Sequence, residues 1–266
     1  MTHARSSRVS RALPASTALP FLRALAIAGL AAASAVAPAA RASAPAETHA
    51  LAISWEPAFC LTKSGKPECT SETPSRADAH QFSLHGLWPQ NGSYCGVSAA
   101  QKSEDQAGEW SMLPAVTLQP ATESLLQVDE PGTMSYLERH EWTEHGTCSG
   151  LSQQNFFAPT LGMLGSVNAS NLGATVAANV GGHVTLSQLQ SAAALDFGTY
   201  AKSDIEYLCV SSGGKSWLEE VRFHLHLPTP LPSSVQASYL TLPKQPASSS
   251  QLCKASASIY IRAVAN

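Results

Sequence analysis

The stretch FSLHGLWPQ, from Phe82 to Gln90, places one histidine in an apolar run that a proline ends. Side chains alternate between the two faces of a strand, so Leu84 should lie on one face and His85 and Leu87 on the other. The proline and the Asn-Gly pair after it are typical of the end of a strand. The stretch therefore predicts a strand that carries His85 close to its end.

Four other segments have the apolar or alternating patterns of strands. They are residues 49–57, 204–212, 217–228 and 256–264. In the third of these, the aliphatic and aromatic residues share one face, whereas Arg222, His224 and His226 share the other. The Gly-Gly pair between the second and third segments predicts a hairpin turn.

Two segments have the pattern of helices. Residues 134–148, MSYLERHEWTEHGTC, contain no proline and have apolar residues at helical spacing up to Gly146, a residue that often ends a helix. Residues 184–195 begin with a capping box formed by Thr185 and Gln188. Together the segments predict an α+β fold in a single domain, with a central antiparallel sheet and helices packed to one side.

The N-terminal segment, residues 1–42, has the features of a secretory signal peptide. Basic residues precede an Ala-rich apolar run, and a small-residue pattern around Arg41 favours cleavage near Ala42. A permanent membrane anchor is the alternative, but the run is short and Pro38 interrupts it. We therefore expect a periplasmic or secreted protein that comprises residues 43–266 and has no membrane contact after cleavage.

The charge of the chain limits how it can bind a polyanion. Five arginines and no acidic residues lie in residues 1–42, so cleavage there would take the formal charge from −3 to −8. Proteins that bind nucleic acid along a whole face are usually basic. Any nucleic acid should therefore bind locally, at a defined site.

All six cysteines follow the predicted signal peptide. An even number in an exported chain predicts three disulfides, although spacing alone leaves fifteen pairings open. A metal cluster is the alternative, and it is disfavoured because the chain contains no C-x-x-C pair. The cysteines are Cys60, Cys69, Cys95, Cys148, Cys209 and Cys253.

The second histidine-rich segment, HEWTEH, starts at His140. On an α-helix Glu141 and His145 share a face because they are four residues apart, and so do His140 and Glu144. The two histidines are five residues apart, about 140° around an α-helix, so they should not converge on a zinc ion as in metalloproteases. A purely structural role for these histidines is the other alternative.

Two histidines on opposite sides of a phosphodiester provide a general base and a general acid near neutral pH. RNA contributes its own nucleophile, the 2′-hydroxyl, so such a site needs no metal, no cofactor and no nucleophilic side chain. Trp88, next to His85 in the first segment, could stack on a base or fill the core. Tyr94 is a second, weaker candidate for substrate binding.

FSLHGLWPQ and HEWTEHGTC together resemble the two active-site segments of the T2-type ribonucleases, in the expected order and separation. The segment ALAISWEPAFC resembles the opening strand of the bacterial members of that family. The resemblance implies a monomeric, metal-independent endoribonuclease of low base specificity, with RNA as its partner and a 2′,3′-cyclic phosphate as its intermediate product.

The resemblance also implies roles for individual residues. His85 would be the general acid, His145 the general base, His140 a phosphate ligand and Glu141 a stabiliser of the phosphorane, while Trp88 would stack on a base. The implied disulfides are Cys60–Cys69, Cys95–Cys148 and Cys209–Cys253.

One position departs from the family pattern, because Glu144 stands where a lysine is usual. A carboxylate there would repel the negative charge of the transition state. A secreted RNA-binding or effector protein with weakened catalysis is therefore an alternative function, and a zinc hydrolase is a third. Activity on RNA in the presence of a chelator would distinguish the three.

Overall fold

The computed structural model describes residues 47–240 and 251–265, so the predicted signal peptide lies outside the described residues. The fold is α+β, as predicted, and its sheet has the strand order β2-β1-β5-β6-β3, with β4 also paired to β5. The strands are β1 (Glu47–Ser54), β2 (Ser83–Pro89), β3 (His183–Val184), β4 (Ile205–Ser212), β5 (Lys215–Leu227) and β6 (Ile259–Tyr260). The β1–β2, β1–β5 and β4–β5 pairs are antiparallel, whereas the short β6 runs parallel to β5.

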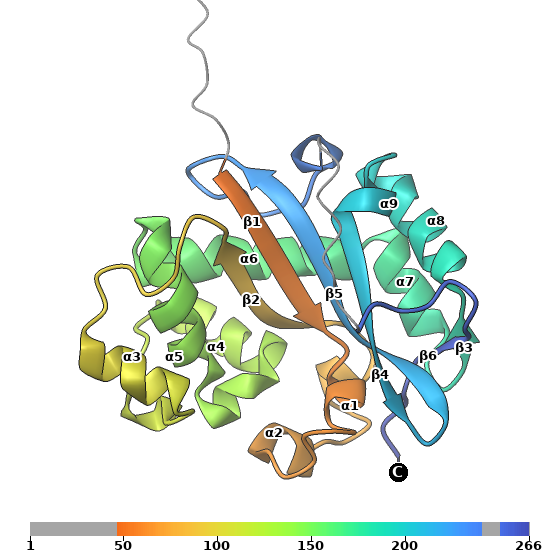
Figure 1. The fold of residues 1–266 in the computed structure, drawn as a ribbon, viewed down its shortest axis with the longest axis horizontal. Helices are drawn as coiled ribbons and strands as arrows, with labels where there is room; N and C mark the ends of the chain where they lie inside the picture. The colour runs from red at the N-terminus through yellow and green to blue at the C-terminus, as the bar shows by residue number, and fades with distance from the viewer. Residues whose placement is uncertain (1–46, 241–250, 266) are drawn as a thin grey trace, which may run out of the picture. The chain divides into compact units, whose positions relative to one another are not determined.

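The helices surround this sheet (Figure 1). They are α1 (Glu56–Phe59), α2 (Pro67–Thr70), α3 (Ala99–Gln106), α4 (Pro120–Asp129), α5 (Leu137–His140), α6 (Gln153–Asn168), α7 (Asn171–Ala178), α8 (Leu186–Phe197) and α9 (Ala201–Asp204). The capping box predicted for α8 is present at Thr185 and Gln188. Among the described residues, no helix has the length and apolar character needed to cross a membrane.

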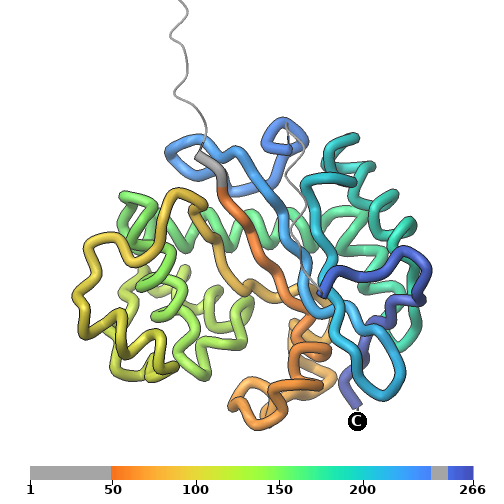
Figure 2. The backbone as a smooth tube through the Cα atoms, viewed as in Figure 1, coloured from red at the N-terminus to blue at the C-terminus, as the bar shows by residue number. Residues whose placement is uncertain are grey.

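The core lies between the sheet and the helices α6, α7 and α8. Leu51 of β1 and Phe223 of β5 are fully buried in one cluster with Phe156 of α6 and Leu189 of α8. The long β4–β5 hairpin turns at Gly213 and its neighbouring glycine, both with positive φ, as the Gly-Gly pair predicted (Figure 2). This hairpin carries the apolar face of β5 into the core and leaves its polar face for other contacts.

Strand β2 contains a bulge at His85. Ala52 of β1 pairs with Gly86, and the next residue, Ile53, pairs with Leu84, so His85 is the extra residue in the ladder. The prediction that Leu84 and Leu87 lie on opposite faces of the strand was wrong. The bulge lies between them, and both side chains are in the core. A one-residue insertion reverses the side-chain alternation beyond it and re-aims the bulged side chain, a frequent arrangement next to active sites.

Hydrogen bonds and disulfides hold the segments around β2 in place. The amide of Asn168, at the end of α6, donates to the Phe82 carbonyl and accepts from the Phe82 N–H, at 2.9 and 3.0 Å. The disulfides are Cys60–Cys69, Cys95–Cys148 and Cys209–Cys253, the pairs that the resemblance implies. Cys148 follows the second histidine segment directly, so its bridge joins that segment to the loop after β2.

Candidate active site

The second histidine segment is not one regular α-helix. α5 continues into a π-helical turn, Glu141–His145, and then a 3₁₀ turn, Gly146–Ser149. Hydrogen bonds from i to i+5 place residues five apart close to one another. The rings of His140 and His145 therefore lie 6.0 Å apart. Our expectation that they diverge was wrong, because it assumed the α-helical period.

Glu141 occupies the centre of the site. Its side chain is 1% exposed, and its Oε2 accepts a hydrogen bond from Trp88 Nε1 at 2.9 Å. Its Oε1 has no hydrogen-bond partner and lies 3.7 Å from His85 Nε2 and 3.9 Å from His140 Nε2. Burial raises the pKa of Glu141 to about 6, although both imidazoles and the indole N–H act to lower it. Gly86 makes this position possible, because a Cβ there would collide with the Glu141 carboxylate.

His85 is held by strand β5. Its Nδ1 is 2.7 Å from Glu220 Oε2, so its Nε2 is left facing Glu141. Burial acts to lower the pKa of His85, but the hydrogen bond and charge of Glu220, together with the charge of Glu141, outweigh it and raise that pKa to about 9. The His85 imidazole is therefore protonated at neutral pH.

His145 has the opposite electrostatic environment. Burial lowers the pKa of His145 to about 3, and positive charge on His140 and His85 adds to the effect. In the part of the chain that the structure describes, no carboxylate lies within 4.0 Å of its ring nitrogens. His145 is therefore a neutral imidazole at physiological pH, available to accept a proton.

His140 is fixed by two further residues that the sequence analysis did not identify. Its Nδ1 lies 2.8 Å from Asp105 Oδ1, and its ring stacks on Trp110 with the centroids 4.7 Å apart. The Tyr94 hydroxyl lies 2.7 Å from Asp105 Oδ2 and 3.1 Å from Glu144 Oε2. Glu144 Oε2 is 3.8 Å from His140 Nε2, so its carboxylate faces the site.

Trp88 lies at the junction of all these groups. Its ring contacts His85 at 5.1 Å and His145 at 5.5 Å between centroids, and the guanidinium of Arg222 lies 5.0 Å from its centre. Its indole N–H is bound to Glu141. The geometry gives Trp88 an organising position, and its stacking on a base remains a prediction, as does substrate binding by Tyr94.

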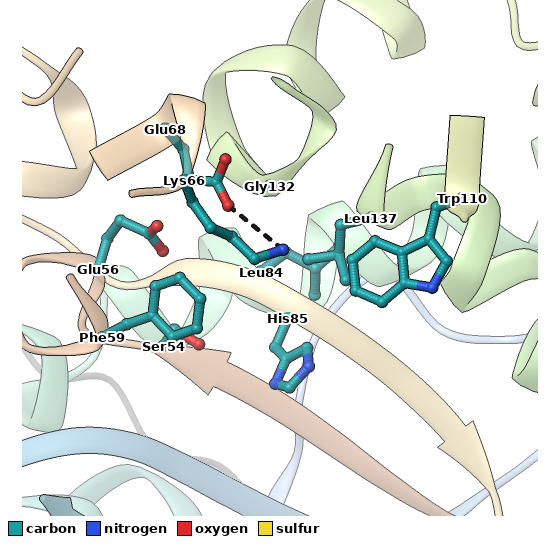
Figure 3. A pocket seen from close by; sticks show the side chains of 10 residues that line it. All are labelled: Ser54, Glu56, Phe59, Lys66, Glu68, Leu84, His85, Trp110, Gly132 and Leu137. Carbon is teal, nitrogen blue, oxygen red and sulfur yellow. Dashed lines mark ion pairs between the residues drawn. The ribbon is translucent and has the colours of Figure 1, made fainter. Parts of the chain in front are cut away.

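A pocket of about 60 Å³ opens beside His85 (Figure 3). Burial, with the nearby charges of Asp78 and Glu68, raises the pKa of Glu56 in this pocket to about 7. Lys66 forms an ion pair with Glu68 at 4.0 Å, drawn in Figure 3, and lies 4.6 Å from the ring centre of Trp110. The lining residues are Ser54, Glu56, Phe59, Lys66, Glu68, Leu84, His85, Trp110, Gly132 and Leu137.

Two sets of side chains around His140 have the donor atoms of a metal site. They are His140–Glu141–His145 and Asp105–His140–Glu144, each with one ligand atom per residue within 4.8 Å of the others. The π turn creates the first set. On a regular α-helix His140 and His145 would lie too far apart around the axis to share a metal ion. The expectation of a metal-free site is thus a prediction to be tested rather than a consequence of geometry.

Four contributors to the site were not singled out from the sequence: Asp105, Trp110, Glu220 and Arg222. The alternation of β5 does place Glu220 on the same face as Arg222, so a signal for this pair was present. What the sequence lacked was the pairing of β1 with β5, which brings that face next to β2. Asp105 and Trp110 had no comparable pattern.

Comparison with known proteins identifies the family. A model of the Ribonuclease T2 family matches residues 47–239. A ribonuclease of Aeromonas hydrophila is 36% identical over 109 residues, which cover 41% of this chain and 40% of that protein. Ribonuclease I of Escherichia coli is 24% identical over 202 residues, which cover 67% of this chain and 75% of that protein.

Solved structures show the same fold. The self-incompatibility-associated SF11 ribonuclease of Nicotiana alata has a TM-score of 0.51 at 16% identity, covering 82% of this chain and 99% of its own. RNase NT, solved in complex with 5′-AMP, has a TM-score of 0.50 at 21% identity, covering 82% of this chain and 98% of its own. The family match spans most of the chain, and the protein therefore belongs to the ribonuclease T2 family.

Proposed function

We propose that the protein is an endoribonuclease that cleaves single-stranded RNA through a 2′,3′-cyclic phosphate, without metal and with low base specificity. The observation that carries the proposal is the gathering of three histidines at one buried carboxylate: Glu141 Oε1 lies within 4 Å of His85 Nε2 and His140 Nε2, and the ring of His145 lies 6.0 Å from that of His140. The raised pKa of His85 and the lowered pKa of His145 support opposite roles for these two. When the environments of two titratable groups shift their pKa values in opposite directions, one group is suited to act as the acid and the other as the base.

The first step transfers one proton at each end of the reaction. His145 accepts the proton of the 2′-hydroxyl as the 2′-oxygen forms a bond to phosphorus. The bond between phosphorus and the 5′-oxygen breaks, and His85 donates its proton to that oxygen. The products are a 2′,3′-cyclic phosphate and a new 5′-hydroxyl.

The second step reverses the two roles. Neutral His85 accepts a proton from water, whose oxygen forms a bond to phosphorus. The bond to the 2′-oxygen breaks, and the His145 imidazolium donates its proton to that oxygen. The product is a 3′-phosphate, and both histidines return to their starting protonation states.

His140 and Glu141 would act on the phosphate between these two groups. His140 Nε2 faces the site because Asp105 binds Nδ1 and Trp110 supports the ring. Glu141 Oε1, buried and without a hydrogen-bond partner, lies within 4 Å of two imidazole nitrogens. We assign to His140 the binding of the phosphate and to Glu141 the stabilisation of the phosphorane together with His85 and His140.

A protein that binds RNA without cutting it is the second candidate function. The observation in its favour is Glu144, whose carboxylate faces His140 and adds negative charge where phosphate would bind. Such a protein would keep the pocket and the aromatic residues but turn over slowly. Its role would be that of a secreted RNA-binding protein or effector.

The proposal includes export. Three disulfides in a chain with an Ala-rich apolar N-terminal segment favour a periplasmic or secreted protein. We propose that it acts as a monomer. Cleavage near Ala42 would be read directly from the N-terminal sequence of the mature protein, and its mass in solution would test the monomer.

The test of function is the release of acid-soluble nucleotides from RNA in the presence of a chelator. We expect undiminished cleavage, a 2′,3′-cyclic phosphate among the early products, and no cleavage of single-stranded DNA, which lacks the 2′-hydroxyl. Binding of RNA without cleavage would favour the second candidate. Inhibition by the chelator, reversed by zinc, would favour a metal-dependent hydrolase.

A further inference from the structure

The hydrogen bond between Glu220 and His85 joins the first histidine segment to a strand far away in the sequence. Glu220 belongs to β5 and is 7% exposed, and its carboxylate lies between two partners. Its Oε2 is 2.7 Å from His85 Nδ1, and its Oε1 accepts a hydrogen bond from Arg222 Nε. A buried carboxylate held on both sides in this way has a fixed orientation.

We propose that Glu220 is a positioning residue for the reaction, holding His85 in one ring orientation and in its protonated form so that it can act as the general acid. The inference rests on the proposed function, because only an enzyme of this kind needs His85 as an acid. It assigns a role to a residue outside both histidine segments.

The orientation follows from the bulge in β2. Because His85 is the extra residue in the ladder, its ring is not fixed by a neighbouring strand position and needs a partner. Glu220 binds Nδ1, which leaves Nε2 directed toward Glu141 at 3.7 Å. The carboxylate on Nδ1 fixes the orientation of the ring and makes Nε2 the nitrogen that gives up its proton in the reaction.

The charge on His85 is set by groups on every element around it. Burial and Arg222 of β5 favour the neutral imidazole, whereas Glu220 of β5 and Glu141 of the π turn favour the imidazolium. The two carboxylates outweigh the other effects, and Glu220 makes the larger contribution because it is hydrogen-bonded to the ring. Other titratable groups nearby are Glu56, Lys66 and Glu68 in the pocket (Figure 3). Glu219 of β5 and His145 also interact electrostatically with His85.

The Glu220→Gln variant separates orientation from charge. The amide oxygen can still accept a hydrogen bond from Nδ1, so the ring keeps its place, but the negative charge that favours the imidazolium is gone. The pKa of His85 should then fall from about 9 toward the ordinary histidine value. The alkaline limb of the kcat profile should shift to lower pH by about one to two units.

The experiment is kcat against pH on one dinucleotide for the unaltered protein, Glu220→Gln and a matched control, Glu206→Gln. Glu206 is paired with another histidine of the sheet, His224, at 3.2 Å, so the control removes the same charge from a carboxylate–imidazole pair that contains none of the three site histidines. Because Glu206 faces Arg222 across the β4–β5 ladder, the control also reports any effect transmitted through Arg222. We expect Glu220→Gln to lose about twofold to tenfold at pH 8, the loss of protonated His85 that a shift of one to two units gives, and almost nothing at pH 5.5. The control should follow the unaltered protein throughout.

A titration of His85 by NMR gives a readout that needs no activity. An unchanged His85 pKa in Glu220→Gln, or an equal loss of kcat at all pH values, would overturn the role of Glu220. If the unaltered protein does not cleave RNA at all, the proposed function fails instead, and the titration still reports whether Glu220 sets the charge of His85. A circular dichroism spectrum that matches that of the unaltered protein would confirm that the variant is folded.

Discussion

The two sides of the active site are built from different secondary structures. On the acid side, His85 lies on the bulged strand β2 and is anchored by Glu220 from strand β5 of the same sheet. On the base side, His145 lies in a π turn, half-buried against Trp88 and His140, with no carboxylate within 4.0 Å among the described residues. The same side chain thus receives a raised pKa in one place and a lowered pKa in the other.

The contrast shows what decides the role of a catalytic histidine here. A hydrogen-bonded carboxylate outweighs burial at His85, whereas at His145 burial acts without such opposition. Both residues depend on a one-residue irregularity, a bulge or a π turn, that a regular strand or helix would lack.

The largest effects should come from the two histidines themselves. His85→Ala and His145→Ala should each reduce kcat on RNA by about 10²–10⁴-fold, because each removes a proton donor or acceptor from the transition state. The measurement is steady-state kinetics on a dinucleotide, with His183→Ala as the control because His183 is exposed and lies on β3. Near-normal activity in either folded variant would refute its assignment.

The next largest effect should follow from filling the space at Gly86. Gly86→Ala places a methyl group where the Glu141 carboxylate lies, so Glu141 must move away from both histidines. We expect kcat to fall by about 10²-fold, the scale of losing one preorganised electrostatic group.

Gly65→Ala is the matched control, because a Cβ at Gly65 meets nothing within 4 Å. Kinetics and thermal unfolding should be measured for both variants. An active Gly86→Ala would mean that Glu141 is dispensable for the reaction, and the contrast between the two sides would then rest on His85 and His145 alone.

A smaller effect is expected for Trp88→Phe. Phenylalanine keeps an aromatic ring against His145 and Arg222 but cannot donate a hydrogen bond to Glu141. The pKa of Glu141 should rise above its value of about 6, because that hydrogen bond stabilises the ionised form. We expect kcat to fall by about tenfold at pH 6, the equivalent of one charged hydrogen bond.

The pH profile separates this effect from base stacking. A loss that shrinks as the pH rises would indicate the bond to Glu141, since Glu141 is then ionised in both proteins. A loss confined to KM, and equal at every pH, would indicate that Trp88 binds the base instead.

An effect of similar size but opposite direction, an increase in kcat, is expected at Glu144. Glu144→Lys replaces a carboxylate 3.8 Å from His140 Nε2 with a cation that favours the charge of the phosphorane, so kcat should rise by about tenfold. Glu109→Lys, an exposed position, makes the same charge change on the surface as a control. A decrease would mean that the hydrogen bond from Tyr94 to Glu144 contributes more than a lysine can.

If Glu144→Lys is no faster, another cation must already serve the phosphate. Arg139, the residue before His140, donates to the carbonyls of Ser111 and Leu113 at 3.0 Å and is thus engaged elsewhere. Arg222, which lies over Trp88, is then the residue to replace.

Much of this architecture was predictable because local patterns and family motifs were strong. The α+β class, the hairpin at Gly213 and the capping box of α8 followed from the sequence pattern, whereas only the family resemblance implied that His85, His140 and His145 share one site. The bulge at His85 and the π turn followed from neither, because each changes the register by one residue. Pairing between distant segments decides that change, and the local composition does not reveal it. The roles of Glu220 and Asp105 were missed for the same reason, since no nearby motif marks them.

The most direct test that His85 is the general acid and His145 the general base uses a substrate whose leaving group needs no acid. Uridine 3′-(4-nitrophenyl phosphate) releases nitrophenolate, which is stable without a proton, so the general acid becomes unnecessary while the general base is still required. We predict that His85→Ala, severely impaired on a dinucleotide, cleaves this ester within about tenfold of the unaltered protein, whereas His145→Ala is impaired on both substrates. If His145→Ala is the variant rescued, the two roles are reversed, and if neither is rescued, the histidines do not divide the reaction as proposed.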